Sequence, residues 1–255
     1  MRAQTMTPNI ERRAFLQTGS LLAAALLANT TLAQRREAGR FTPWSQGPID
    51  ALAPGEHVLA DNDGRRTLLY LPPTYKADTP APFLLMLHGA RGNGDRTLEQ
   101  ERAAADEHGV ILLSPSSRQG TWDGIRSGFT YDFETLDAHL QTTFGLCSVD
   151  PKRMAVGGFS DGASYGITLG LINGDMFSHV IAHSPGFIIA NNWHGKPQVY
   201  ISHGTQDTVL PFDRCGKVIA ERLTREGYNP RFDVFDGGHT ASPQLRSDAL
   251  AWLRS

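Results

Sequence analysis

An α/β fold built on a mostly parallel, twisted sheet is predicted by two features of the 255-residue sequence. Short apolar runs alternate along the chain with segments whose apolar residues recur at helical spacing. Alternation of this kind implies crossover connections, which make neighbouring strands parallel and place helices on both faces of the sheet. No linker, repeat or low-complexity tract interrupts the pattern, so residues 34–255 are predicted to form a single domain.

The individual elements follow from local patterns. Two strands, 57–61 and 65–71, are expected to form a hairpin because the turn Asn62-Asp63-Gly64 separates them. The continuous apolar run 82–87 indicates a strand buried on both faces. The remaining elements are expected to alternate: helix 97–108, strand 110–113, helix 131–144, strand 153–159, helix 161–172, strands 180–183 and 198–203, helix 212–226, strand 231–235 and helix 242–253.

Composition excludes several classes of protein. With 40% hydrophobic and 20% charged residues, the chain has the composition of a globular protein and not of a disordered one. The 24 basic and 26 acidic residues give a net charge of −2, which argues against nucleic acid as the main partner. No apolar run reaches the roughly 18 to 20 residues that a membrane-spanning helix needs.

Residues 1–33 have the layout of an export signal. Arg12-Arg13 precedes Phe15-Leu16, a short apolar stretch follows over 21–27, and Ala33 is the small residue that a signal peptidase prefers. The arginine pair resembles the signal of the twin-arginine (Tat) export machinery, which is therefore an expected partner. The alternative is a surface helix with a chance arginine pair. We expect cleavage near Ala33 and a periplasmic or secreted protein.

Two cysteines are present, Cys147 and Cys215. The predicted elements place Cys147 before a strand and Cys215 beyond the opposite ends of the strands, roughly 15 Å away at about 3.3 Å per strand residue. A disulfide needs Cα atoms within about 7 Å of each other. We therefore expect two free thiols.

The strongest chemical motif is Gly158-Phe159-Ser160-Asp161-Gly162, which lies between an apolar strand and a helix. G-x-S-x-G in this context is typical of a sharp turn that lifts a nucleophilic serine above the sheet, because glycine relieves the crowding on either side. The turn also places the hydroxyl at a helix N-terminus, which favours developing negative charge. The alternative is a serine that only caps the helix. We expect Ser160 to be the nucleophile.

Acyl transfer also needs N–H groups aimed at the oxygen that becomes negative. The backbone N–H of Asp161, directly after the nucleophile, is one expected donor. The other is the N–H of Ala90, in the glycine-rich loop after the third predicted strand, with Arg91 as the alternative. The alternative is a glycine-rich turn that binds nothing.

A base and an acid are expected in the loops after the last two strands. His239 follows Asp236-Gly237-Gly238, and Asp207 follows the strand that ends at His203. A serine hydroxyl needs a base, and the base needs a carboxylate that holds its tautomer, in the chain order Ser, Asp, His for this fold. We judged His203 too early in its loop, and Asp236 too close to His239, to replace these residues.

Together these pieces resemble the α/β-hydrolase superfamily, and within it small bacterial esterases of the phospholipase/carboxylesterase and polyhydroxybutyrate-depolymerase-like groups. The matching segments are Leu87-His88-Gly89, Asp150-Pro151-Lys152-Arg153, the Ser160 pentapeptide, His203-Gly204-Thr205-Gln206-Asp207 and Gly237-Gly238-His239. The resemblance implies hydrolysis of carboxylic esters through an acyl-enzyme. These groups often carry Gln or Asn after the nucleophile, and the carboxylate of Asp161 is expected to repel anionic acids.

The pocket is expected to be open. Only residues 184–197 separate two predicted strands where larger relatives insert a lid, so no lid domain is expected. Trp122 is a candidate wall of the substrate pocket, unless it only packs its loop down, as aromatic residues usually do. No metal-binding motif is present, so neither a metal nor another cofactor is expected.

The sequence therefore predicts a serine esterase acting on a small-molecule or polymer-end ester. An acyltransferase or a peptidase of the same superfamily would use the same three side chains. A non-catalytic binding protein is the alternative from another class of function. The identity of the ester and the oligomeric state do not follow from these motifs.

Overall fold

The computed structural model describes residues 37–44 and 52–255. Residues Gly39–Ser255 form one compact unit. The expected export signal at residues 1–33 lies outside the described residues and stays a prediction. Within the described residues, no helix is long and apolar enough to span a membrane.

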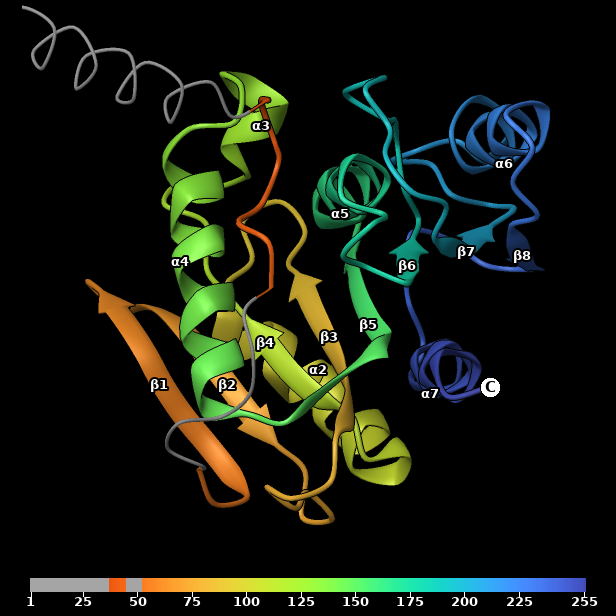
Figure 1. Ribbon diagram of the computed structural model, residues 1–255. Coiled ribbons are helices and arrows are strands. Elements are labelled where there is room, and N and C mark those ends of the chain that lie inside the picture. The colour runs from red at the N-terminus through yellow and green to blue at the C-terminus, as the bar shows by residue number, and fades with distance from the viewer. Residues whose placement is uncertain (1–36, 45–51) are drawn as a thin grey trace, which may run out of the picture. The chain divides into compact units, whose positions relative to one another are not determined.

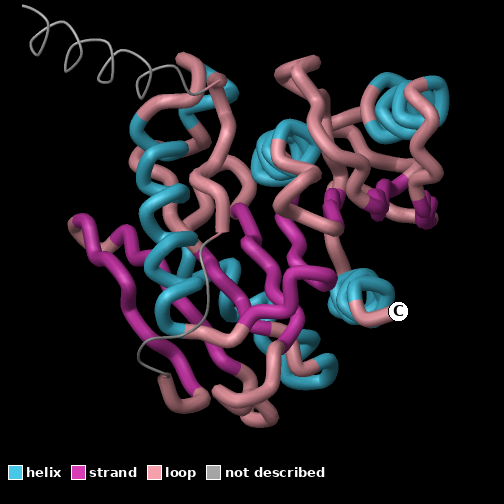
Figure 2. Tube along the Cα trace, in the orientation of Figure 1, coloured by secondary structure: helices cyan, strands magenta, loops and turns pink. Residues whose placement is uncertain are grey.

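One eight-stranded sheet forms the centre of this unit, with strand order β1-β2-β4-β3-β5-β6-β7-β8 (Figures 1 and 2). The pairs β1–β2 and β2–β4 are antiparallel, and all other neighbours are parallel. This arrangement confirms the predicted mostly parallel sheet. The strands are β1 (Gly55–Asn62), β2 (Arg65–Leu71), β3 (Ala81–Leu87), β4 (Ile111–Ser114), β5 (Val149–Phe159), β6 (His179–His183), β7 (Gln198–Gly204) and β8 (Arg231–Phe235).

Helices cover both faces of the sheet. Buried residues of α4, α5 and α6 pack in one apolar cluster on one face, and those of α2 and α7 pack in a second cluster on the other face. The helical elements are α2 (Gly94–His108), α3 (Asp123–Arg126), α4 (Tyr131–Leu146), α5 (Asp161–Ile172), η1 (Phe212–Arg214), α6 (Gly216–Arg225) and α7 (Pro243–Leu253).

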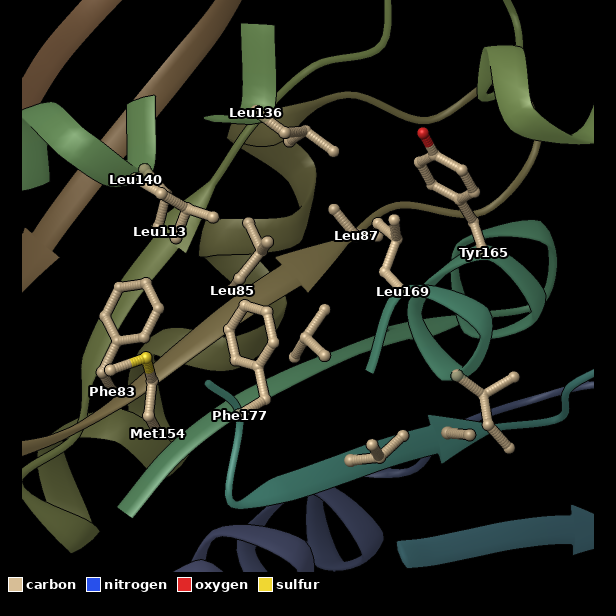
Figure 3. Packing of buried hydrophobic residues seen from close by; sticks show 14 of the residues in the cluster. Phe83, Leu85, Leu87, Leu113, Leu136, Leu140, Met154, Tyr165, Leu169 and Phe177 are labelled. Carbon is tan, nitrogen blue, oxygen red and sulfur yellow. The ribbon is translucent and has the colours of Figure 1, made fainter. Parts of the chain in front are cut away.

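Strand β3 contributes to both clusters, as its continuous apolar run predicts. Phe83 and Leu85 pack on the α4 side, where Figure 3 shows them beside Leu140. Leu84 and Met86 pack on the opposite side. Alternate side chains of a strand point to opposite faces, so a strand covered on both sides has no place for a polar residue.

Strand β5 begins at Val149, four residues before the predicted strand, and two helical elements differ from the sequence prediction. The expected helix 212–226 is interrupted at Cys215, whose φ of −121° and ψ of −95° are not helical. The break brings the Gly216 backbone against the His203 imidazole, where a Cβ would overlap the ring. The four-residue helix α3 was not predicted, because four residues are too few to show a helical period. Both cysteines are free and buried.

The parallel strands bring distant loops to one edge of the sheet. Ser160 follows β5, Asp207 lies beyond β7, His239 lies beyond β8, and the 88–93 loop follows β3. The carboxyl ends of parallel strands meet at one edge, which is where α/β sheets bind ligands. Between β6 and β7, residues 184–197 contain no helix, and no helical insertion stands at this position.

Candidate active site

Ser160 occupies a strained turn between β5 and α5. Its φ of 57° and ψ of −119° lie outside the regions that a residue with a Cβ ordinarily adopts, and its N–H donates to the His183 carbonyl at 3.0 Å. A Cβ on Gly158 would overlap the Gly162 backbone, and a Cβ on Gly162 would overlap the Leu87 carbonyl. Glycine is therefore required at both positions for the turn to close.

An unbroken hydrogen-bond chain joins three of the predicted residues. His239 Nε2 lies 2.8 Å from Ser160 Oγ, and His239 Nδ1 lies 2.6 Å from Asp207 Oδ2. A carboxylate only accepts, so Nδ1 carries the proton and Nε2 is free to accept the serine O–H. The side chain of His239 is 15% exposed and that of Asp207 is fully buried, so solvent reaches the imidazole and not the carboxylate.

Asp207 is held as a carboxylate by its surroundings. Burial raises the pKa of this carboxyl, but hydrogen bonds from His239 and from two backbone N–H groups outweigh burial and leave the pKa below its ordinary value. The backbone donors are Val209 at 2.9 Å and Leu210 at 2.8 Å, both to Oδ1. The group is thus a charged acceptor at neutral pH.

A second histidine contacts the same carboxylate. His203 Nε2 donates to the Leu210 carbonyl at 2.8 Å and lies 3.3 Å from Asp207 Oδ2. It is His239 and not His203 that bonds to both Ser160 and Asp207, as expected from the early position of His203 in its loop, but the contact between His203 and the carboxylate was not anticipated. The loop folds back over the strand end, and the sequence offers no local signal for that. The rival acid Asp236 instead accepts from the Gln206 side chain at 2.6 Å.

The loop after β3 presents the expected oxyanion donors. The N–H of Arg91, the alternative donor, already donates to the Gly120 carbonyl at 2.6 Å. Among the described residues, the structure records no protein acceptor for the N–H of Ala90 or of Asp161. Both groups are therefore available to a bound oxygen.

His88 and Trp122 fix the start of this loop. His88 Nδ1 donates to the Gly89 carbonyl at 2.7 Å, while Nε2 accepts from the Ser117 N–H at 3.0 Å. Burial lowers the pKa of His88 to about 4, which keeps the ring neutral and this tautomer in place. The Trp122 indole N–H donates to the His88 carbonyl at 2.9 Å.

The position of Trp122 corrects one prediction. Trp122 is fully buried, stacks on Tyr165 with ring centroids 5.7 Å apart, and does not line the hollow beside Ser160. It therefore packs its loop against the β3 end and does not form a substrate wall. Burying the large aromatic surface of Trp122 beneath the loop is more favourable than exposing it in the hollow.

A hollow of about 420 Å³ opens beside Ser160 and His239. The charged side chains among its lining residues are all arginines: Arg91, Arg96 and Arg246. The carboxylate of Asp161 does not line it and accepts instead from Thr121 Oγ1 at 2.7 Å. The expected repulsion of anionic acids by Asp161 therefore has no direct basis in the hollow, and the arginines were not anticipated.

Across residues 37–44 and 52–255, no group of three His, Cys, Asp or Glu side chains is arranged to hold a metal ion. Two histidines of the site, His239 and His203, both contact Asp207. The arrangement of these groups is suited to proton transfer between protein side chains.

The fold and this site define an α/β-hydrolase, and comparison with known proteins gives the family. Residues 109–254, more than half of the chain, match the phospholipase/carboxylesterase family. The chain belongs to that family and is a carboxylic ester hydrolase. The resemblance inferred from the sequence motifs is thereby confirmed.

Individual relatives agree with this assignment. The chain is 25% identical to a protein named probable feruloyl esterase C from Aspergillus niger, over 80% of this chain and 86% of that protein. It is 32% identical to acyl-protein thioesterase 1 from Eremothecium gossypii, over 41% of this chain and 48% of that protein.

Solved structures share the fold at low identity. The substrate-bound fluorophosphonate-binding serine hydrolase F of Staphylococcus aureus superposes with a TM-score of 0.61 at 16% identity, covering 75% of this chain and 92% of that one. A ferulic acid esterase from Anaeromyces mucronatus, in complex with ferulic acid, gives a TM-score of 0.55 at 19% identity, covering 72% and 82%. Identities this low support the fold alone.

Proposed function

We propose that the protein hydrolyses carboxylic esters with Ser160 as nucleophile, His239 as base and Asp207 as the acid that orients His239. The observation that carries the proposal is the continuous hydrogen-bond chain Ser160–His239–Asp207, with both distances below 3 Å. A serine hydroxyl is a weak nucleophile until an adjacent base takes its proton, and the imidazole is placed to do so.

The reaction has two halves. Ser160 Oγ attacks the ester carbonyl as its proton passes to His239 Nε2, and the imidazolium that forms is stabilised by the carboxylate of Asp207. His239 then returns the proton to the departing alcohol, leaving an acyl-enzyme on Ser160. Water repeats the sequence on the acyl-enzyme, releasing the acid and restoring the serine.

Negative charge on the substrate oxygen is met by the backbone N–H groups of Ala90 and Asp161. Neither donor has a recorded partner among the described residues, so neither must break a protein hydrogen bond to serve. Donors fixed in advance stabilise the tetrahedral intermediate without reorganisation, and one such donor contributes about 10²- to 10³-fold in kcat.

The test is Ser160→Ala, assayed with 4-nitrophenyl acetate and by labelling with a fluorophosphonate. We expect kcat to fall by at least about 10⁴-fold and labelling to disappear. Ser127→Ala, on an exposed loop, is the matched control and should retain both. A Ser160→Ala protein that keeps most of its activity would refute the proposal.

Product analysis addresses the alternative chemistry. With an alcohol added as acceptor, an acyltransferase would form a new ester in preference to the free acid, whereas the proposed hydrolase releases mainly acid. An aminoacyl amide tests for peptidase activity. Because curated relatives are named feruloyl esterases, methyl ferulate belongs among the esters compared.

Export is proposed separately, because it rests on residues 1–33 alone. The arginine pair Arg12-Arg13 supports the Tat machinery as partner and a periplasmic or secreted location for a mature chain that starts after Ala33. Residues 1–40 fused to a reporter should direct its export. Changing both arginines to lysine should block it, and export that is insensitive to this change would exclude the Tat route.

A further inference from the structure

The hollow beside Ser160 is positively charged on one side. Arg91 lies in the loop that follows the Ala90 donor, and Arg96 lies in the first turn of α2. Both side chains are exposed, and no Asp or Glu is among the lining residues. An ester bound at Ser160 therefore lies in a field that favours negative charge.

Of the acids of α2 near Arg96, two are paired with other arginines, and Glu99, three residues further along, is exposed and does not line the hollow. Asp95 pairs with Arg66, and buried Glu101 pairs with Arg246, the third arginine of the hollow. Burial lowers the pKa of Arg246 to about 10, so it remains a cation at neutral pH, but Glu101 balances its charge. Among the described residues, no ion pair is recorded for Arg91 or Arg96.

Both arginines also occupy positions that their own backbone disfavours. Arg91 has a φ of +62°, in the left-handed region that glycine adopts at lower cost. Arg96 lies at the positive end of the α2 helix dipole, where a cation is disfavoured by a few tenths of a kcal/mol or more. A bound anion would offset the second of these costs directly.

We propose that the ester substrate carries an anionic group, of the size of a carboxylate, which pairs with Arg91 and Arg96 while its carbonyl lies at Ser160. The inference rests on the proposed function, because it concerns the substrate of the same site. A guanidinium presents paired donors that match the two oxygens of a carboxylate. The carboxylate of Asp161 does not line the hollow and is bonded to Thr121, so it does not compete for these two guanidinium groups.

Two pairs of esters test the proposal, each pair matched in shape and different in charge. For the acid half, the mono-4-nitrophenyl ester of adipic acid is compared with its primary amide. For the alcohol half, 4-acetoxybenzoate is compared with 4-acetoxybenzamide. The readout is the ratio of kcat/KM for the anionic ester to that for the neutral ester, because this ratio cancels general losses of activity.

In the unaltered protein we expect a ratio of about 2 to 20 for one of the two pairs of esters, which is the combined effect of pairing with two exposed arginines. Raising NaCl from 0.05 to 0.5 M should reduce the ratio, because the Debye length shrinks below the separation of exposed charges. Arg91→Gln combined with Arg96→Gln should lower the ratio toward one, the value without any preference for charge. Arg96→Glu should lower the ratio further.

Two controls separate charge from structure. Arg96→Lys keeps the positive charge and should retain most of the preference. Arg225→Gln removes an exposed arginine of α6 that lies outside the hollow, and both the ratio and the individual rates should be unchanged.

The outcomes distinguish this inference from the proposed function. If neutral esters are hydrolysed in a Ser160-dependent way but neither anionic ester is preferred, or the preference survives the double glutamine variant, the charge inference alone is overturned. If no ester of either kind is hydrolysed, the proposed function fails and this inference fails with it.

Discussion

At the scale of single residues, the site depends on which hydrogen bonds are already taken. The Arg91 N–H is committed to Gly120, which leaves Ala90 as the donor of the β3 loop. His239 has both ring nitrogens engaged, one by the acid and one by the nucleophile. Hydrogen bonds to charged groups are among the stronger ones in proteins, so this chain holds the imidazole in one tautomer and one orientation.

Trp122 is predicted to act on catalysis indirectly. Trp122→Phe removes the indole N–H and leaves the His88 carbonyl without that donor, at a cost of about 1–3 kcal/mol in the free energy of unfolding. Because His88 begins the loop that carries Ala90, we expect kcat to fall by about tenfold through a misplaced oxyanion donor. KM should change little, since Trp122 does not line the hollow.

Trp193→Phe is the control for this experiment. Trp193 also donates its indole N–H to a backbone carbonyl, that of Ala190 at 2.9 Å, but it lies outside the hollow. The Trp193→Phe substitution removes a similar hydrogen bond but should alter kcat by less than about twofold. A Trp122→Phe protein with unchanged kcat and unchanged stability would contradict the role assigned to Trp122.

At the scale of elements, the turn between β5 and α5 requires close contact between backbones. The glycines on either side of Ser160 allow α5 to begin directly against the ends of β3 and β5. Here the neighbouring atoms are backbone, and moving them would displace Ser160 from His239.

Gly158→Ala and Gly145→Ala should therefore have opposite effects. The new methyl group at position 158 would overlap the Gly162 backbone, and we expect a loss of at least about 2 kcal/mol in stability together with most of the activity. At position 145, within α4, no atom lies within 4 Å of the added methyl. There the substitution should stabilise the protein by about 0.4–1 kcal/mol, because alanine loses less backbone entropy on folding.

Urea denaturation and 4-nitrophenyl acetate hydrolysis measure both effects. If the two substitutions changed stability and activity equally, the backbone of the turn would have moved to admit the methyl group. That result would contradict the proposal that Ser160 is rigidly placed.

At the scale of the whole molecule, several buried histidines make stability depend on pH. Burial lowers the pKa of His88, His179 and His183 to about 4 each. In the unfolded chain an imidazole has a pKa of about 6.5. Above about pH 6.5 these rings are neutral in both states, and the free energy of unfolding has its full value. As pH falls from 6.5 toward 4, the free energy of unfolding decreases, because the unfolded chain takes up protons that the folded protein excludes.

We expect the free energy of unfolding to fall over that interval by on the order of 1 kcal/mol per pH unit for each histidine. Urea titrations at pH 7.5, 6.5, 5.5 and 4.5 measure the slope. His179→Gln, which lies away from the hollow, should reduce the slope by on the order of 1 kcal/mol per pH unit. Equal stability at pH 7.5 and 4.5 would show that these rings are protonated in the folded protein at little cost.

Local patterns along the chain were sufficient for the fold and for the three residues of the hydrogen-bond chain. The hairpin at 57–71, the apolar run of β3 and the Ser160 pentapeptide each lie within about a dozen residues, and their meaning depends on backbone preferences and periodicity over that length. The chain order Ser160, Asp207, His239 then follows from parallel strands, whose carboxyl ends meet at one edge.

Tertiary structure alone decided the surroundings of these residues. Whether Trp122 faces the hollow or the core, whether His203 reaches Asp207, and which acids neutralise the arginines near Ser160 depend on contacts between segments separated by many residues. Such contacts are set by how strands align and how side chains pack against one another, and neither is encoded in the period of a single element. The type and order of the reactive groups are therefore a property of the sequence, while the charge and shape of the space around them arise only when the chain is folded.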